Sequence, residues 1–283
     1  MSFSPTLAPI LVDQHTHTAH SHGKDTVAAM AASAFAKGLK VMGFSEHSPR
    51  PEEYAYPSDY QAKLVAGFPA YVAEVLAEKE RYAGRMEILL GLEMDYMPAE
   101  NAFAEQSVAA YPYEYVIGSV HFQGLWGFDF AAADWETLSG QTRADMFTRY
   151  YQDQKRMAET GLFQIAGHCD LIKLFSKPAF DAWIQTRDAQ NTVRETLAVM
   201  KANGMAMEVS SAGIRKGLGE PYPGPVIMRL ARELDLPVAF GSDAHSVGDV
   251  AFGLDDLAAY AHGFGYTQSA FFRNKVMQIL TFA

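Results

Sequence analysis

The chain alternates between short apolar runs and longer segments with helical periodicity. The apolar runs have the length and composition of buried β-strands and cover residues 9–12, 40–45, 87–93, 115–120, 163–166, 205–210 and 237–242. Strands that alternate with helices are typical of a parallel sheet with right-handed crossover connections. The sequence therefore predicts an α/β fold with seven principal strands.

Three of the segments between these runs carry signals for helix ends or breaks. Segment 25–38 begins with Asp25 or Thr26 as a candidate N-cap and ends at a glycine. Segment 224–235 has Pro225 in its first turn, where proline is favoured. Segment 59–84 contains Pro69, so we expect a kink or two separate helices there.

Every predicted strand is followed by polar or ionisable side chains. These are His15, His17, Glu46, His47, Glu93, His121, His168, Asp170, Ser210, Ser211, Asp243 and His245. The ligand crevice of an open sheet uses only some strand ends, whereas a barrel gathers all of them around one axis. The pattern favours a TIM-like barrel with its site at the C-terminal mouth. Because no low-complexity linker divides the chain, we expect residues 1–283 to form a single domain.

The histidines are concentrated in these strand-end loops. The stretch "DQHTHTAHSH" alone holds four of the nine, and only His262, which we expect to be structural, lies outside the loops. Residues i and i+2 of an extended strand point the same way, so His15 and His17 can bind one ion. Packing or helix capping would explain any single histidine, but eight of them together with carboxylates indicate metal ligands. The set exceeds what one ion can use, so we expect two or three divalent ions.

Composition narrows the function classes. The formal charge is -10, with 33 acidic and 23 basic residues and no run of Lys or Arg, so we expect no nucleic-acid partner. The single cysteine, Cys169, excludes an internal disulfide, and no apolar run approaches the length of a membrane span. The first ten residues lack the pattern of a signal peptide. We expect a cytoplasmic protein that does not bind membranes and whose oligomeric state the sequence leaves open.

Neighbouring metal ions are suited to in-line displacement at phosphorus. One ion activates a water to hydroxide near neutral pH, and the others neutralise the phosphate oxygens and the leaving alkoxide. Glu93, with two carboxylate oxygens, is the natural bridge between ions. A phosphate monoester also requires cationic groups, for which Lys173 and Arg215 are candidates because they lie just beyond strand ends.

The motifs resemble those of the polymerase and histidinol phosphatase (PHP) superfamily of metal-dependent phosphoesterases, most closely its histidinol-phosphate phosphatase branch. The superfamily resemblance spans residues 13 to 245 and rests on "HTHTAHSHG", "GFSEHSPRP", "LLGLEMDY", "GHCDLIKLF" and "AFGSDAH". The branch is indicated by "IGSVHFQGLWGFD" and "VSSAGIRKGLGEPYPG". The resemblance implies a distorted (β/α)7 barrel and hydrolysis of L-histidinol phosphate to L-histidinol and phosphate, in histidine biosynthesis.

The resemblance also implies a trinuclear centre. Its first ion would be held by His15, His17, Glu93 and Asp243, its second by Glu93, His121 and His168, and its third by His22, His47 and His245. Glu93, Asp243 and His245 are the residues expected to be catalytic, and Lys173 and Arg215 match positions that bind substrate phosphate. Zinc, iron or manganese would suit these ligands.

Some alternatives stay open at this point. The family commonly has one more residue before its next ligand than this chain has before His22, so His20 competes for that position. The general acid could be Asp13, Asp170 or a second metal-bound water. The alternative functions are hydrolysis of another small phosphate ester, an amidohydrolase-type reaction, action on nucleic acid, and a metal-binding regulator without catalysis.

Overall fold

The computed structural model describes residues 7–54 and 60–283. Residues 1–6, part of the segment searched for a signal peptide, lie outside them. The centre is a nine-stranded sheet in which every neighbouring pair is parallel except the last, β10–β11. In order across the sheet its strands are β1 (Val12–Asp13), β2 (Val41–Phe44), β3 (Glu87–Asp95), β4 (Tyr115–Ser119), β7 (Ile165–Ala166), β8 (Ala206–Ser210), β9 (Val238–Gly241), β10 (Gln268–Arg273) and β11 (Val276–Thr281).

Each of the seven predicted strands is present, so the predicted α/β fold with a mostly parallel sheet is confirmed. Two hairpins were not predicted. A short one, β5 (Phe122–Gln123) and β6 (Trp126–Gly127), follows β4. The other joins β10 to β11 through Asn274 and Lys275, whose φ angles of 50° and 61° suit a two-residue hairpin turn.

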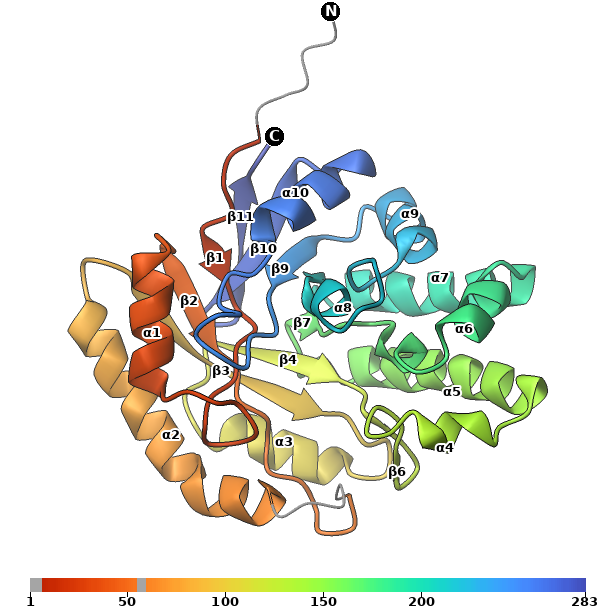
Figure 1. Cartoon of the computed structure of the whole chain (residues 1–283), viewed down its shortest axis with the longest axis horizontal. Coiled ribbons are helices and arrows are strands. Elements are labelled where there is room, and N and C mark those ends of the chain that lie inside the picture. The colour runs from red at the N-terminus through yellow and green to blue at the C-terminus, as the bar shows by residue number, and fades with distance from the viewer. Residues whose placement is uncertain (1–6, 55–59) are drawn as a thin grey trace, which may run out of the picture.

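Helices surround the sheet on its outer side (Figure 1). They are α1 (Val27–Ala36), α2 (Tyr60–Tyr82), α3 (Asn101–Ala109), α4 (Ala133–Glu136), α5 (Gly140–Glu159), the 3-10 helix η1 (Leu171–Lys173), α6 (Lys177–Ile184), α7 (Arg187–Ala202), α8 (Ala212–Arg215), α9 (Pro225–Glu233) and α10 (Leu254–Gly263). None of the helices in the described ranges is long and apolar enough to cross a membrane.

The helix-end signals are largely confirmed. Thr26 is the N-cap of α1, where its side chain accepts a hydrogen bond from the backbone N–H of Ala29, and Pro225 is the first residue of α9. The alternative of two helices around Pro69 is wrong, because α2 is one helix that contains it. Proline removes the hydrogen bond to the carbonyl four residues earlier, and Val65, which carries that carbonyl, is exposed at 53% so that water can replace the bond.

The parallel strands enclose a small apolar core of their own. Its members come from eight strands and are Val12, Val41, Leu89, Tyr115, Ile117, Ile165, Ala206, Ala239, Ala270, Phe271 and Phe272. Tyr115 of β4 reaches across two neighbouring strands, and its hydroxyl donates to the backbone carbonyl of Gln14, just after β1, at 2.6 Å. A Cβ on Gly43 or Gly91 would lie 2.1 or 2.3 Å from this ring, so only glycine fits beneath it. The sheet is therefore strongly curved.

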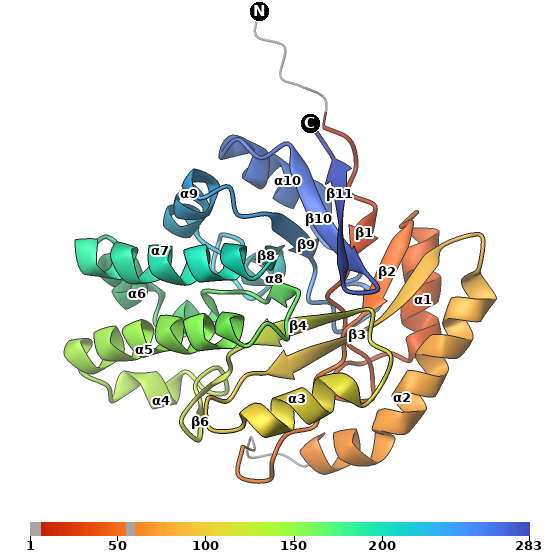
Figure 2. The same cartoon turned by 180° about the vertical axis from the view of Figure 1, so that it is seen from behind.

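The curvature brings β1 and β9, the first and the seventh of the predicted strands, close together. No strand ladder joins β1 to β9 in the described part of the chain, but an isolated parallel bridge pairs Thr16 with Ala244 in the segments that follow them. The β10–β11 hairpin occupies the space between β9 and β1 (Figure 2), where the side-chain amide of Gln14 exchanges two 2.8 Å hydrogen bonds with the backbone of Phe272. Closure into a complete (β/α)7 barrel stays a prediction.

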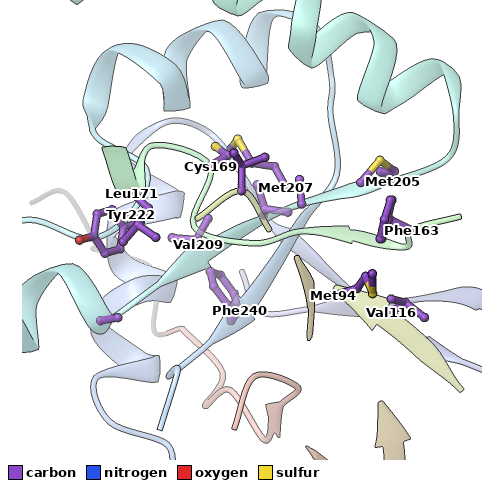
Figure 3. Close-up of a cluster of buried hydrophobic side chains, with 14 of the residues drawn as sticks. Met94, Val116, Phe163, Cys169, Leu171, Met205, Met207, Val209, Tyr222 and Phe240 are labelled. Atoms are coloured by element: carbon purple, nitrogen blue, oxygen red, sulfur yellow. The ribbon is translucent and has the colours of Figure 1, made fainter. Parts of the chain in front are cut away.

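A larger core fills the space between the sheet and its helices. Figure 3 shows part of it, in which Met207 and Val209 of β8 lie close to Cys169 and Leu171. All four side chains are at most 1% exposed. This packing on the outside and Tyr115 on the inside hold the strands from both faces, so that their C-terminal ends form a fixed frame for the loops.

Candidate metal centre

The predicted ligand residues converge at the C-terminal ends of the parallel strands. His15 and His17 follow β1, His47 follows β2, and Glu93 lies near the end of β3. His121 and His168 come just after β4 and β7, and the segment after β9 carries Asp243 and His245. Because parallel strands end at the same edge of a sheet, residues far apart in the sequence meet there.

The side chains form three overlapping groups whose ligand atoms all lie within 4.8 Å of one another. The groups are His15, His17 and Glu93; Glu93, His121 and His168; and His17, His47 and His245. The second has the same members as the set implied by the sequence resemblance, and the first has three of the four implied members, without Asp243. In the third, His17 takes the place expected for His22. The donor set of imidazoles around shared carboxylate oxygens has the chemistry of a site for divalent ions.

Glu93 is the centre of this arrangement. Its Oε2 lies 3.0 to 3.4 Å from nitrogens of His15, His17 and His47, and its Oε1 lies 3.0 Å from His168 Nε2 and accepts a 2.6 Å hydrogen bond from Ser119. Burial alone would raise the pKa of Glu93, but the charges of His15 and His47 and hydrogen bonds from the rings hold it well below its usual range. An anion with each oxygen facing a different set of histidines has the geometry of a bridging ligand.

Asp243 faces His15 and His17 from the segment after β9. Its Oδ1 lies 3.3 Å from His17 Nε2 and 3.8 Å from His15 Nε2. Burial opposes ionisation, but Lys216 and His245 nearby and a hydrogen bond with His17 hold the pKa of Asp243 well below its usual range. Asp243 has a φ of 51°, a left-handed conformation that Asp adopts more readily than most residues and that often occurs at functional sites.

Asp13 holds the Asp243 segment in place from behind. Its carboxyl group accepts hydrogen bonds from the backbone N–H and the hydroxyl of Ser242, at 3.0 and 2.5 Å, and from the N–H of Ala251 at 3.0 Å. Burial raises the pKa of Asp13, although these hydrogen bonds act in the other direction. Neither Asp13 nor Asp170, the two side chains considered as general acid, is among the described residues that line the pocket at the site.

Three buried carboxyl groups contact the outer nitrogens of the histidine rings. Glu208 lies 2.6 Å from His15 Nδ1, Glu46 lies 3.3 Å from His17 Nδ1, and Asp95 contacts His121 Nδ1. Burial opposes ionisation of Glu46 and Asp95, but interactions with His17 lower the pKa of Glu46 to about 2, and the charges of Arg50 and His121 do the same for Asp95.

An ionised carboxylate can only accept, so Nδ1 carries a proton in His17 and His121, whose pKa neighbouring carboxylates raise to about 9 although burial opposes this. When such a ring binds a metal ion it is neutral, and Nε2, which faces Glu93, is then the ligand atom. Metal-binding histidines are usually oriented by such partners. None of these three roles was predicted from the sequence. The sequence did contain signals for them. Glu46 directly precedes His47, and Asp95 lies two positions after Glu93 on the same strand face. Glu208 is a lone acid within the apolar run at 205–210.

His20 and His22 have different surroundings. His20 Nε2 lies 3.1 Å from Glu74 Oε2 on helix α2, at the surface. The ring of His22 lies beside the third group, with its centroid 4.3 Å from that of His245 and 4.9 Å from that of His47, and it lines the pocket. This geometry favours His22 over His20 as the fourth member of that group.

The two predicted substrate cations are engaged with other groups. Lys173 is buried and binds Asp170 and Glu220 at 2.7 and 2.8 Å, and it lines a neighbouring pocket instead. The guanidinium of Arg215 donates to the backbone carbonyls of Ser242 and Asp243. Their roles in phosphate binding stay predictions.

A cavity of about 290 Å³ opens over the three groups. Besides His22, His47, Glu93, His121, His168, Asp243 and His245, it is lined by Arg50, Asp129, Phe130 and Lys216. Arg50, Phe130 and Lys216 were not assigned to the site from the sequence. The pocket thus combines cationic, anionic and aromatic groups around the ligand cluster.

Comparison with known proteins finds relatives that match most of the chain. A protein of Deinococcus radiodurans named "Probable histidinol-phosphatase" is 34% identical over 273 residues, 95% of this chain and 98% of that protein. The "Histidinol-phosphatase" of Bacillus subtilis is 28% identical over 258 residues, 85% of this chain and 95% of that protein. A crystal structure of histidinol phosphate phosphatase from Lactococcus lactis, with zinc, L-histidinol and phosphate, matches with a TM-score of 0.72 and 16% identity over 94% of this chain and 98% of that one, which shows a shared fold. Residues 13–212 match the model of the family described as PHP domain, and the chain belongs to that family.

Proposed function

We propose that this protein is a metal-dependent phosphomonoesterase that hydrolyses L-histidinol phosphate to L-histidinol and phosphate. The observation that carries the proposal is the set of three overlapping ligand groups, joined by Glu93, that opens into one pocket. The substrate is supported by the relatives named histidinol-phosphatase, which match over nearly the whole chain. The reaction belongs to histidine biosynthesis, for which we expect a cytoplasmic location.

The centre would hold up to three divalent ions. The first would be held by His15, His17, Glu93 and Asp243, the second by Glu93, His121 and His168, and the third by His47 and His245 together with His22 and His17. Imidazole and carboxylate ligands suit zinc, iron or manganese, and availability selects among them. His245 supports the third assignment, since its Nδ1 donates to the Asp243 carbonyl at 2.9 Å and its buried Nε2 has no hydrogen-bond partner.

The ions would supply a hydroxide nucleophile at neutral pH and neutralise charge on the phosphoryl oxygens. The protein fixes where this chemistry occurs. Glu93 would contribute one oxygen to each of two ion positions, and Asp243 and His245 would contribute ligand atoms from the segment after β9. The nearly complete burial of Glu93 keeps water away from the ligands and strengthens their electrostatic interactions.

The remaining pocket residues are suited to the rest of the substrate. Lys216, whose Nζ lies 3.5 Å from Asp243 Oδ2, borders the cavity over the ligand groups, and its charge would stabilise a phosphate dianion bound there. Asp129 borders the same cavity and has the charge to bind the substrate ammonium, and Phe130 offers an aromatic face for the imidazole. A different small phosphate ester is the alternative substrate.

Removal of the metal ions should abolish the phosphatase activity. Glu93→Ala should reduce kcat by roughly 100-fold or more, because it removes a ligand from two ions at once. Activity is measured with histidinol phosphate after chelation and after readdition of zinc or manganese. The control is Glu195→Ala, an exposed carboxylate paired with Lys155 far from the site. Full activity of chelated protein would contradict the proposal.

The roles of His20 and His22 can be separated by matched substitutions. His22→Ala should lower the metal content by about one ion per chain, since one ligand of the third position is lost. His20→Ala should leave the metal content at the wild-type value, because its ring is bound to Glu74. Elemental analysis of both variants decides, and the reverse result would make His20 the ligand.

Lys216 and Arg215 should differ in their effects on catalysis. Lys216→Met should raise KM for the phosphate ester about tenfold, because it removes a charge that borders the pocket. Arg215→Met should act mainly on kcat, because the guanidinium holds the carbonyl of Asp243. Steady-state kinetics on both variants test this ranking. A larger rise in KM for Arg215→Met would assign the phosphate to Arg215, as the sequence resemblance implies.

The substrate assignment requires a comparison of phosphate esters. We expect kcat/KM for L-histidinol phosphate to exceed that for p-nitrophenyl phosphate and simple sugar phosphates, because only histidinol phosphate presents both an ammonium and an imidazole to Asp129 and Phe130. The panel is measured on metal-loaded protein at one pH. Equal values across the panel would leave a phosphatase of a different small ester.

A further inference from the structure

Glu46 is a hub of hydrogen bonds beneath the histidine-rich loop. Its side chain is fully buried, and its Oε2 accepts from the backbone N–H of Thr18 at 2.9 Å and from the Thr18 hydroxyl at 2.5 Å. Its Oε1 accepts from the Ser21 hydroxyl, from the N–H of His47 at 3.1 Å and from His17 Nδ1 at 3.3 Å. One carboxylate thus serves five donors from four residues, which is more than orientation of a single ring requires.

The residues that Glu46 holds define a tight loop, residues 18–23. The N–H of Ser21 donates to the Thr18 carbonyl at 3.2 Å, and a Cβ on Gly23 would lie only 2.6 Å from the same carbonyl oxygen. His22 lies between Ser21 and Gly23, and its ring is stacked on that of His47 and lies beside that of His245. The position of this ring therefore depends on how the loop is fastened to Glu46.

Glu46 itself is fixed to the sheet. Its backbone N–H donates to the hydroxyl of Tyr71 at 3.2 Å, and that hydroxyl donates to the carbonyl of Gly91 at 3.3 Å. The backbone carbonyl of Glu46 accepts a hydrogen bond from the N–H of Glu93 at 3.0 Å. The hub is thus held in register with the bridging carboxylate, so that the loop is positioned relative to Glu93.

We propose that Glu46 is a positioning residue that shapes the 18–23 loop and thereby determines occupancy of the third ion position, at His17, His22, His47 and His245. The proposal rests on the proposed metal centre. Glu46 acts through the loop and not on the substrate, since it is not among the described residues that line the pocket. The first and second ion positions depend less on Glu46, because only His17 among their proposed ligands contacts this residue.

Only a carboxylate satisfies this arrangement. Glutamine has the same shape but replaces one acceptor oxygen by an NH2 group that only donates. If the amide nitrogen takes the place of Oε2 it meets the N–H of Thr18, and if it takes the place of Oε1 it meets the N–H of His47. Both orientations set donor against donor, so Glu46→Gln should loosen the loop without changing side-chain volume.

The test measures stepwise metal binding by Glu46→Gln. Metal-free full-length protein is titrated with zinc or manganese alone, and bound ions are counted by elemental analysis after gel filtration. We expect the weakest-bound ion to dissociate about 10- to 100-fold more readily than in the wild type, with the other ions retained. Glu74→Gln is the matched control, since it changes the carboxylate that contacts His20 in the same loop and should bind metal as the wild type does.

Folding is monitored by circular dichroism and thermal unfolding of each variant. If Glu46→Gln does not fold, Ser21→Ala decides, because it removes one donor to Glu46 and should weaken the same ion to a smaller degree. Unchanged binding of all ions in a folded Glu46→Gln or in Ser21→Ala would overturn the proposal, as would equal weakening of every ion. Failure of the wild type and of Glu74→Gln to bind any ion would instead overturn the proposed metal centre.

Discussion

The structure depends on how one buried anion, Glu93, is compensated. A carboxylate 1% exposed at the end of a strand would be very costly to bury alone. The cost is offset by nitrogens from three different strand ends and by the hydroxyl of Ser119. The same groups also bring the two oxygens of Glu93 and several ring nitrogens close enough together to bind common metal ions. Stability of the strand ends and the capacity to bind ions therefore have one physical origin.

The curved sheet explains why these groups can meet. Tyr115 fills the interior and contacts the chain just after β1, and glycines at 43 and 91 allow its ring to pass. A flatter sheet would separate His17 from His168, which come from strands four positions apart in the sheet order. Residues with no ligand function thus set the distances within the site, since the interior packing fixes the spacing of the strand ends.

The sequence predicted which strand ends carry the clustered candidate ligands, because parallel topology brings the C-terminal ends of strands to one edge regardless of side-chain detail. It did not predict which way each side chain points. Lys173 follows a strand end as expected, yet its ammonium binds Asp170, three residues earlier, and Glu220, which is distant in sequence. The role of Glu208 was missed because its partner His15 is 193 residues away, and a lone acid in an apolar run does not reveal which residue it contacts. The β10–β11 hairpin was not predicted either, because it is an antiparallel pair that lies beyond the alternation of parallel strands and helices.

The charges around the site have a consequence for its substrate. Burial opposes ionisation of Glu46, Glu93, Asp95 and Asp243, but the histidines and cations beside them hold the pKa of all four below the usual range. Burial also opposes protonation of the rings, yet the same carboxylates raise the pKa of His17 and His121 to about 9 and that of His15 well above its usual range. Without ions the carboxylates therefore face protonated rings near neutral pH. A histidine ligand is neutral, so divalent ions would replace these protons, and their larger charge, with Lys216 at the rim, would attract a phosphate dianion. The ions would thus serve both to hold the substrate and to assist its hydrolysis, and their binding would stabilise the folded state that offers the ligands.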